Sequence, residues 1–222
     1  MVSFHFDATN TFCISLEKHT ERWNRMQARF QKENLEVTRW IATTPETLTY
    51  NFHHYLSPGE RACAQSHVRI WRHMLANNME YAFVLEDDAC FDKNWRTKLA
   101  GFQIDDPYWD LLLLNASEPV DPPFVWMDVQ EQYLTAGYIL SLRGAIRLLQ
   151  WFEGNFASSD WMTSRLQQNN HSYCYFPWLV IQEGMDSTLK KPGETHDADH
   201  EKVVRCLKEI DYDLSNYGVE SE

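Results

Sequence analysis

Hydrophobic and polar positions along the first quarter of the chain predict a strand, a helix and a second strand. Residues 11–16 form a short apolar run rich in β-favouring side chains, and residues 20–32 carry apolar side chains at helical spacing. Residues 36–41 form another β-favouring run, whereas residues 43–56 show neither pattern and predict a loop. A strand, a helix and a strand in this order predict a βαβ unit within a mostly parallel sheet.

The clearest helix start lies just after this loop. Ser57 can cap a helix, Pro58 suits its first turn, and Glu60 can close a capping box with the cap residue. The helix is expected to run to about Asn77. The side chains expected on its inward stripe are Cys63, His67, Ile70, Trp71 and Met74.

The alternation continues through the middle of the chain. Residues 81–85 predict a buried strand that runs directly into the acidic triplet Glu86–Asp88. Residues 109–114 and 133–142 predict two further strands, and residues 143–152 predict a helix. The acidic triplet therefore stands at the carboxyl end of a buried strand.

The last third of the chain is less regular. Ser158 predicts the cap of a short helix that carries Asp160, residues 173–181 predict an extended segment, and residues 201–210 predict a final helix. The composition becomes polar and irregular from about residue 182. With 222 residues, 44% of them hydrophobic, the chain can bury roughly 70% of its unfolded surface. We therefore expect one α/β domain with a mostly parallel central sheet flanked by helices.

The charge balance narrows the classes of ligand. The chain carries 32 acidic and 20 basic residues, a formal net charge of -12. This excess gives nucleic acid no basic surface on which to dock, so we expect no nucleic-acid partner. A phosphate-bearing ligand would need local arginines or a divalent cation to offset the negative field.

Cysteine usage and hydropathy suggest a compartment. No C-x-x-C pair occurs, and an odd number of scattered cysteines favours reduced thiols over a disulfide framework or a structural zinc site. They are Cys13, Cys63, Cys90, Cys174 and Cys206. The first residues form no basic and apolar leader, and no stretch approaches the roughly 18 apolar residues of a membrane span. The expectation is a cytoplasmic protein with no integral membrane segment.

The acidic triplet is the strongest chemical signal in the residues themselves. Like charges at contact distance repel, so Glu86, Asp87 and Asp88 require an offsetting charge, for which a divalent cation is the simplest source. In open parallel sheets, ligands bind beyond the carboxyl ends of the strands. Oxygen ligands there suit Mg²⁺ or Mn²⁺ shared with a diphosphate. Solvated acids at the strand end are the alternative interpretation.

A series of motifs between residues 11 and 188 gives this signal a context. The motifs, in chain order, are Cys13–Leu16, Glu21 with Arg22, Leu56–Glu60, Cys63, Ser66 with His67, Trp71, Leu85–Asp88, Trp109 with Asp110, Ala136–Tyr138, Ser141, Gly144 with Ala145, and Asp160. In this order they resemble glycosyltransferase family 25, the LPS galactosyltransferase-like and collagen galactosyltransferase-like enzymes. Two segments depart from the family pattern, Arg61–Ala62 and Met185–Ser187.

The resemblance implies a fold and a reaction. The fold would be GT-A type, a Rossmann-like arrangement of nucleotide-diphospho-sugar transferases. The reaction would move a hexose, with galactose as the expected sugar, from a UDP-sugar to a hydroxyl of a glycan or glycoconjugate acceptor. It would proceed with inversion and would belong to lipopolysaccharide or other glycan biosynthesis.

The resemblance also implies site residues. Asp88, assisted by Glu86, is the expected ligand of Mn²⁺ or Mg²⁺ and a catalytic residue. In an alternative, one acid of the triplet holds a ribose hydroxyl. The residues expected to contact the nucleotide sugar are Ile14, Ser15, Leu16, Arg22, Glu86, Asp87, Ser66 and His67.

Three of these roles compete with structural ones. Inversion requires a base facing the acceptor hydroxyl, for which Asp160 is the candidate, although it also suits a helix N-terminus. Arg22 is expected either to pair with phosphate or to be solvated, and its neighbours Arg25 and Arg29 are expected at the surface. His67 is either a hydrogen-bonded core histidine or a residue of the site wall.

Other interpretations stay open at this point. Residues 195–201 carry several potential metal ligands, but a solvated segment is the favoured interpretation. A catalytically inactive relative that binds a nucleotide sugar or a glycan-assembly partner is the main alternative function. A metal-dependent phosphohydrolase is a third, although such enzymes usually gather carboxylates and histidines from several strand ends.

Overall fold

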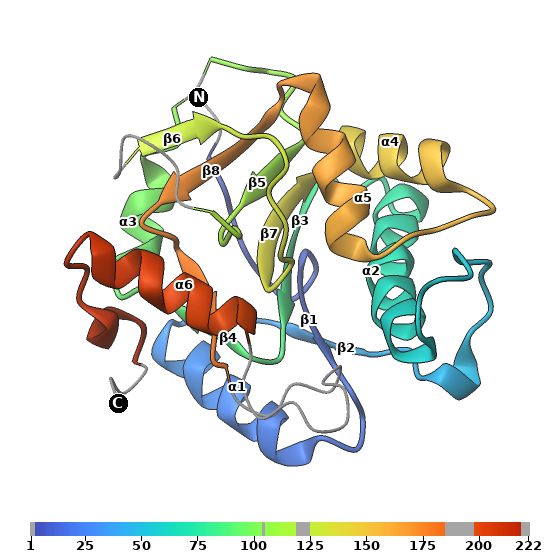
Figure 1. Cartoon of the computed structure of the whole chain (residues 1–222), viewed down its shortest axis with the longest axis horizontal. Coiled ribbons are helices and arrows are strands. Elements are labelled where there is room, and N and C mark those ends of the chain that lie inside the picture. The colour runs from blue at the N-terminus through green and yellow to red at the C-terminus, as the bar shows by residue number, and fades with distance from the viewer. Residues whose placement is uncertain (1–2, 104, 119–124, 185–197, 219–222) are drawn as a thin grey trace.

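A computed structural model of the chain describes residues 3–103, 105–118, 125–184 and 198–218. Within these residues the elements alternate as expected and build one large sheet, covered by helices on both faces (Figure 1). The helices are α1 Thr20–Lys32, α2 Pro58–Ala76, α3 Trp95–Ala100, α4 Leu142–Phe152, α5 Ser159–Leu166 and α6 Ala198–Glu209. Short 3-10 turns occupy Pro45–Thr47, Gln167–Asn169 and Leu214–Tyr217.

The described residues form a seven-stranded sheet in the order β2-β1-β3-β7-β5-β8-β6 and a separate ribbon of β4 and β9. Five strands of the large sheet run in one direction, while β7 and β6 run against their neighbours, so the sheet is mostly parallel as predicted. The strands of the large sheet are β1 Thr11–Ser15, β2 Thr38–Ile41, β3 Tyr81–Glu86, β5 Leu111–Leu113, β6 Val125–Asp128, β7 Gly137–Ser141 and β8 Ser172–Phe176. The ribbon consists of β4 Ala89–Phe91 and β9 Val180–Gln182.

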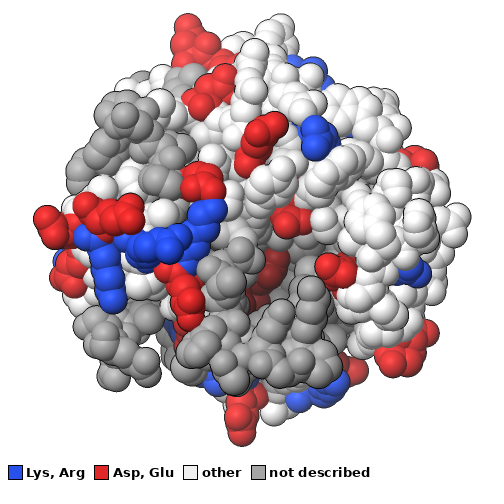
Figure 2. All heavy atoms as spheres, in the orientation of Figure 1, with Lys and Arg blue, Asp and Glu red and all other residues white. Residues whose placement is uncertain are grey.

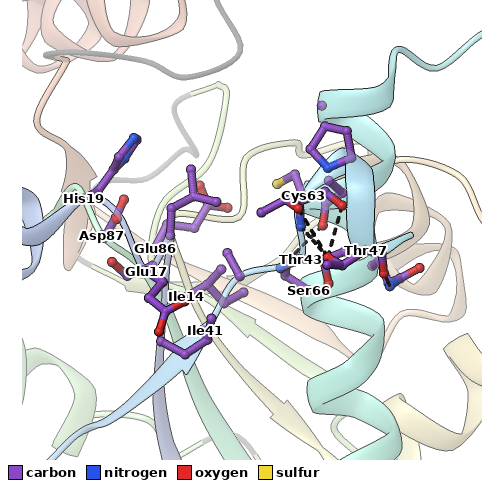
Figure 3. A pocket seen from close by; sticks show the side chains of 18 of the residues that line it. Ile14, Glu17, His19, Ile41, Thr43, Thr47, Cys63, Ser66, Glu86 and Asp87 are labelled. Carbon is purple, nitrogen blue, oxygen red and sulfur yellow. Dashed lines mark hydrogen bonds between the residues drawn. The ribbon is translucent and has the colours of Figure 1, made fainter. Parts of the chain in front are cut away.

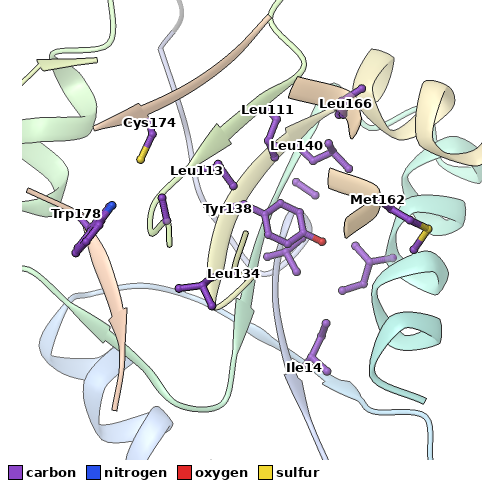
Figure 4. Packing of buried hydrophobic residues seen from close by; sticks show 14 of the residues in the cluster. Ile14, Leu111, Leu113, Leu134, Tyr138, Leu140, Met162, Leu166, Cys174 and Trp178 are labelled. Atoms are coloured by element: carbon purple, nitrogen blue, oxygen red, sulfur yellow. The ribbon is translucent and has the colours of Figure 1, made fainter. Parts of the chain in front are cut away.

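Strand side chains alternate between two cores, as the period of two in a strand requires. Phe12 and Ile14 of β1 pack in the core beneath α2, α4 and α5, whereas Cys13 between them packs in the core beneath α1 and α3. Figure 4 shows the first of these cores, with Tyr138 of β7 at its centre and its hydroxyl directed toward α2. A sheet buried on both faces explains why its strands read as continuous apolar runs.

The predicted start of α2 is confirmed in detail. The backbone N–H of Glu60 donates to Ser57 Oγ at 3.3 Å, and the backbone N–H of Ser57 donates to Glu60 Oε2 at 2.7 Å. This reciprocal capping box engages Glu60 in the helix cap. The cap fixes the direction in which α2 leaves the loop and hence the face that it presents to β1 and β3.

Several boundaries differ from the sequence prediction. The strand expected over residues 133–142 begins only at Gly137, because Leu134 has a positive φ of 80° that breaks the extended backbone. The extended segment at 173–181 is two strands in different sheets. The pattern missed β4, α3 and β6, which are too short to show a period.

Two chemical expectations can also be compared with the structure. All five cysteines are free, as predicted. In the described part of the chain, no helix combines the length and the apolar character needed to cross a lipid bilayer. Acidic side chains are spread over the face drawn in Figure 2, whereas basic ones gather mainly over α6.

Candidate active site

A cavity of about 1140 Å³ lies beyond the carboxyl ends of β1, β2 and β3. This is the edge at which open parallel sheets bind ligands. Cys63 and Ser66 on α2 lie on one side of the cavity, Glu17 and Asp87 lie on the other, and Glu86 stands between them (Figure 3). The predicted site residues that line it are Ile14, Ser15, Leu16, Arg22, Ser66, Glu86, Asp87 and Asp88.

The acidic triplet forms part of the cavity wall because β3 ends at Glu86 and the chain then turns into β4. Arg22 in the first turn of α1 offsets part of its charge. The guanidinium Nη2 lies 2.6 Å from Asp87 Oδ1 and 3.3 Å from Asp88 Oδ2. Arg22 is buried, which rules out the solvated arginine, one of the two alternatives that the sequence left open. The charge of Arg22 also acts on Glu86, so this guanidinium affects all three acids of the triplet.

The side chain of Glu86 makes its described hydrogen bonds through one carboxylate oxygen. Its Oε1 lies 3.2 Å from His67 Nε2 and accepts a hydrogen bond from Thr135 Oγ1 at 2.8 Å. Burial would raise the pKa of Glu86, but the hydrogen bonds from His67 and Thr135 and the charge of Arg22 together lower it below its usual value. Glu86 is therefore a carboxylate at neutral pH.

His67 belongs to the core rather than to the cavity surface. It is completely buried, and its Nδ1 lies 2.9 Å from the hydroxyl of Tyr138. The sequence left open whether His67 is a core histidine or a site residue; it is a core histidine in contact with a site residue. Thr135 was missed by sequence reasoning, and the only signal was its place one residue before the Ala136–Tyr138 motif.

Cys63, His67 and Glu86 together have the ligand types of a metal centre. Their Sγ, ring nitrogen and carboxylate oxygen atoms lie within 4.8 Å of one another. Burial, followed by the charges of Glu86 and Asp160, raises the pKa of the Cys63 thiol well above its usual value. The thiol is therefore protonated and unreactive unless a cation displaces its proton.

Ser66 and Ser15 connect the cavity wall to the scaffold. Ser66 Oγ accepts from the backbone N–H of Thr43 at 2.9 Å and donates to the carbonyl of Ala62 at 2.9 Å. Ser15 Oγ accepts from Arg39 Nη2 at 3.3 Å. Both hydroxyls are engaged within the protein and hold the strand-end loops in place.

Two other arginines of α1 are also directed inward. Arg29 Nη2 lies 2.5 Å from Glu183 Oε1, and Arg25 Nε lies 3.6 Å from Glu183 Oε2. Arg25 and Arg29 were expected at the surface; their side chains are 35% and 24% exposed, and both pair with Glu183. These contacts connect α1 to the end of β9.

Asp160 is not among the described residues that line the cavity. It lies in the first turn of α5, where its Oδ1 accepts from the backbone N–H of Trp161 at 2.7 Å. The Oγ of its neighbour Ser159 lies 3.3 Å from Thr135 Oγ1, which is also the hydroxyl that contacts Glu86. The start of α5 is therefore connected to Glu86 through Thr135. Of the potential metal ligands in residues 195–201, those at 195–197 lie outside the described residues, whereas Asp199, His200 and Glu201 belong to α6.

The fold and this cavity define an α/β protein with a cavity at the carboxyl ends of its strands, beside a cluster of carboxylates. A family model described as "Glycosyltransferase family 25 (LPS biosynthesis protein)" matches residues 8–121, which include β1, α2 and the acidic triplet. The chain belongs to glycosyltransferase family 25, and the predicted resemblance is confirmed.

Individual relatives agree with the family match. A glycosyltransferase 25 family member of Anopheles gambiae is 28% identical over 169 residues, which cover 64% of this chain and 28% of the relative. Procollagen galactosyltransferase 1-B of Xenopus laevis is 38% identical over 106 residues, covering 42% of this chain and 17% of the relative. The chain thus matches only about a quarter of the length of the mosquito relative.

Proposed function

We propose that this chain transfers a hexose, with galactose as the expected sugar, from a UDP-sugar to a hydroxyl of a glycan or glycoconjugate acceptor. The observation that carries the proposal is the acidic triplet in the wall of a cavity at the carboxyl ends of parallel strands. The name of the Xenopus relative, a procollagen galactosyltransferase, supports galactose as the sugar. A GT-A type fold and inversion at the sugar carbon belong to the same proposal.

The donor set fits a hard divalent cation, Mn²⁺ or Mg²⁺. Such ions bind carboxylate oxygens, and Asp88 and Glu86 both contribute such oxygens to the cavity wall. Among the described residues, five acids and three Lys or Arg side chains line the cavity, so a further cation would favour the approach of a diphosphate. When bound, the ion would act as a Lewis acid on the leaving diphosphate.

The remaining groups bind and orient the substrates. Ile14, Ser15 and Leu16 form the strand end against which the nucleotide would lie, as the cavity lining allows. Asp160 is the proposed base for the acceptor hydroxyl. Its Oδ1 is engaged by the backbone of α5, so Oδ2 would take the proton.

A donor screen tests this function. The protein is incubated with UDP-galactose, UDP-glucose and their N-acetyl forms, with Mn²⁺ or with EDTA, and released UDP and acceptor modification are both measured. Transfer that depends on Mn²⁺ supports the proposal. Release of phosphate without transfer would contradict it and indicate a hydrolase.

One observation favours a second candidate, a catalytically inactive relative. Arg22 forms ion pairs with Asp87 and Asp88. Such pairs would also be expected if these acids only stabilised the fold. Calorimetric binding of UDP with Mn²⁺, without turnover of any donor in the screen, would support this candidate over the enzyme.

A further inference from the structure

A chain of buried hydrogen bonds runs from α2 through β7 and back to the cavity. Trp71 Nε1 donates to the hydroxyl of Tyr138 at 3.1 Å, and this hydroxyl lies 2.9 Å from Nδ1 of His67. Nε2 of His67 in turn lies 3.2 Å from Oε1 of Glu86. Trp71, His67 and Tyr138 are completely buried, so water does not compete for these contacts.

The number of available protons determines which atom donates and which accepts in each of these hydrogen bonds. An indole nitrogen is only a donor, so the oxygen of Tyr138 accepts from Trp71. The hydroxyl proton of Tyr138 then needs an acceptor, and among the described residues His67 Nδ1 is the acceptor within reach. Burial raises the pKa of Tyr138, which keeps this proton on the hydroxyl. It follows that Nδ1 accepts and that Nε2 carries the proton donated to Glu86.

This tautomer determines how Glu86 faces the cavity. Oε1 accepts from His67 and from Thr135, and no residue that the structure describes is hydrogen-bonded to Oε2. Glu86 lines the cavity, and 22% of its side chain is exposed there. The carboxylate is thus held by one oxygen while the other is presented to a ligand.

We propose that His67 and Tyr138 are positioning residues that hold Glu86 with Oε2 toward the nucleotide-sugar cavity. Two donors on one oxygen remove the rotational freedom that Glu86 would otherwise lose on ligand binding. The expected gain in affinity for the nucleotide-sugar donor rests on the proposed function, whereas the tautomer of His67 does not.

The geometry of Cys63, His67 and Glu86 offers the competing arrangement. A metal ion on Nε2 would require the proton to move to Nδ1, which would then donate to Tyr138. The hydroxyl proton of Tyr138 would lose its acceptor in the buried core, at the free-energy cost of an unmade hydrogen bond. This arrangement therefore becomes an outcome of the test.

The first experiment observes the tautomer directly. Nitrogen-15 NMR of the histidine rings distinguishes a proton on Nε2 from one on Nδ1, and the spectrum of the His67→Gln variant assigns the His67 signals by their disappearance. From the hydrogen-bond geometry we expect a proton on Nε2 and none on Nδ1. A proton on Nδ1 would overturn the proposal and leave Nε2 available to a metal ion.

The second experiment measures the consequence for the donor. Tyr138→Phe removes the hydroxyl that fixes His67. Tyr173→Phe is the matched control, because Tyr173 also donates a buried hydroxyl, to Asp106 at 2.8 Å, but away from the cavity. We expect KM for the UDP-sugar to rise about 3- to 10-fold in Tyr138→Phe, with a smaller change in kcat, and less than about 2-fold in Tyr173→Phe. Equal effects in the two variants would overturn the positioning role.

A third pair of variants separates the two sides of the imidazole. The amide nitrogen of Gln reaches the position of Nε2, so His67→Gln keeps a donor for Glu86, whereas Asn reaches only the position of Nδ1. We expect His67→Gln to retain donor affinity within about 3-fold and His67→Asn to lose about 10-fold, once folding of both is verified by thermal unfolding. Equal losses in the two folded variants would overturn the proposal. If no donor is turned over or bound by the wild type, the proposed function fails while the tautomer measurement still stands.

Discussion

Two regions of this molecule place carboxylates against arginines, with different results. Asp110, just before β5, is completely buried, and its oxygens lie 2.8 Å from Arg143 Nε and 2.5 Å from Arg147 Nη1. At the cavity, the guanidinium of Arg22 contacts Asp87 and Asp88, and its charge also acts on Glu86. One anion held by two cations closes the contact between α4 and the sheet. The described lining of the cavity, by contrast, carries five acids and three Lys or Arg side chains, a charge balance that favours a cationic ligand.

The comparison shows what separates a structural acid from a functional one in this fold. Trp109 with Asp110 and Glu86–Asp88 are both parts of the family resemblance, and both contain acids next to an apolar strand. The number of arginines and the presence of the cavity distinguish them. Each of the following predictions asks whether an acid behaves as its charge balance requires.

The largest effect is expected at the cavity. Asp88→Ala should lower transfer by about 10²- to 10³-fold, because it removes a ligand of the ion that stabilises the departing diphosphate. The unfolding midpoint should change little. Asp105→Asn, at an exposed acid outside the cavity lining, is the control. Full activity of Asp88→Ala in a Mn²⁺-supplemented assay would remove the metal assignment.

The reverse pattern is expected at the buried acid. Asp110→Asn leaves Arg143 and Arg147 without their carboxylate and should lower the free energy of unfolding by about 2–3 kcal/mol. This is below the usual range for a broken buried pair, because both arginines are partly exposed. Chemical denaturation measures the loss. If Asp110→Asn kept its stability but lost activity, Asp110 would be a functional acid and not a structural one.

Arg22 tests the charge balance itself. Arg22→Gln removes a cation that pairs with Asp87 and Asp88, so binding of Mn²⁺ alone should strengthen by about 10-fold, on the order expected for a unit charge near a protein surface. Arg143→Gln is the control and should leave Mn²⁺ binding unchanged. Titration calorimetry without nucleotide gives the answer, and weaker Mn²⁺ binding in Arg22→Gln would count against a cation site at these acids.

The smallest effect is expected at a third acid, Asp106, which contacts no arginine among the described residues. Burial would raise its pKa, but hydrogen bonds from His171 and Tyr173 lower it below the usual value. A lowered folded-state pKa stabilises the protein fully above the unfolded value of 3.8, and this contribution is lost as the pH falls through the folded value. Asp106→Asn should therefore lose about 1 kcal/mol near neutral pH and show a flatter decline in acid.

Urea denaturation of the wild type and Asp106→Asn at a series of pH values from about 6 to 2 measures this difference. As the pH falls, the free energy of unfolding of the wild type should approach that of the variant. A constant difference at all pH values would show that the variant acts through packing instead of through the carboxylate charge.

Much of the fold could be predicted because its signals are local. The capping box at Ser57 and Glu60, the period of α2 and the apolar run of β3 each depend on residues within a few positions of one another. The shortest elements, β4 and α3, were missed because three to six residues are too few to establish a period.

The site could be predicted only in part. The sequence placed an acidic triplet at a strand end, and the structure puts it on a cavity wall. The partners of the triplet were not predictable, since Arg22 and His67 come from helices on opposite faces of the sheet. Their contact with adjacent acids depends on β3 lying inside the sheet, between β1 and β7.

The sequence by itself therefore determined which segments are helices and strands, where the acids stand and to which family the chain belongs. These properties follow from periodicity, capping and motif order, which neighbouring residues carry. The tertiary structure alone decided which acids pair with arginines and that Glu86 is hydrogen-bonded through one oxygen. It also decided that Asp110 is buried while the triplet lines a cavity. Strand order and helix packing make these decisions, because they alone bring distant side chains within hydrogen-bonding distance.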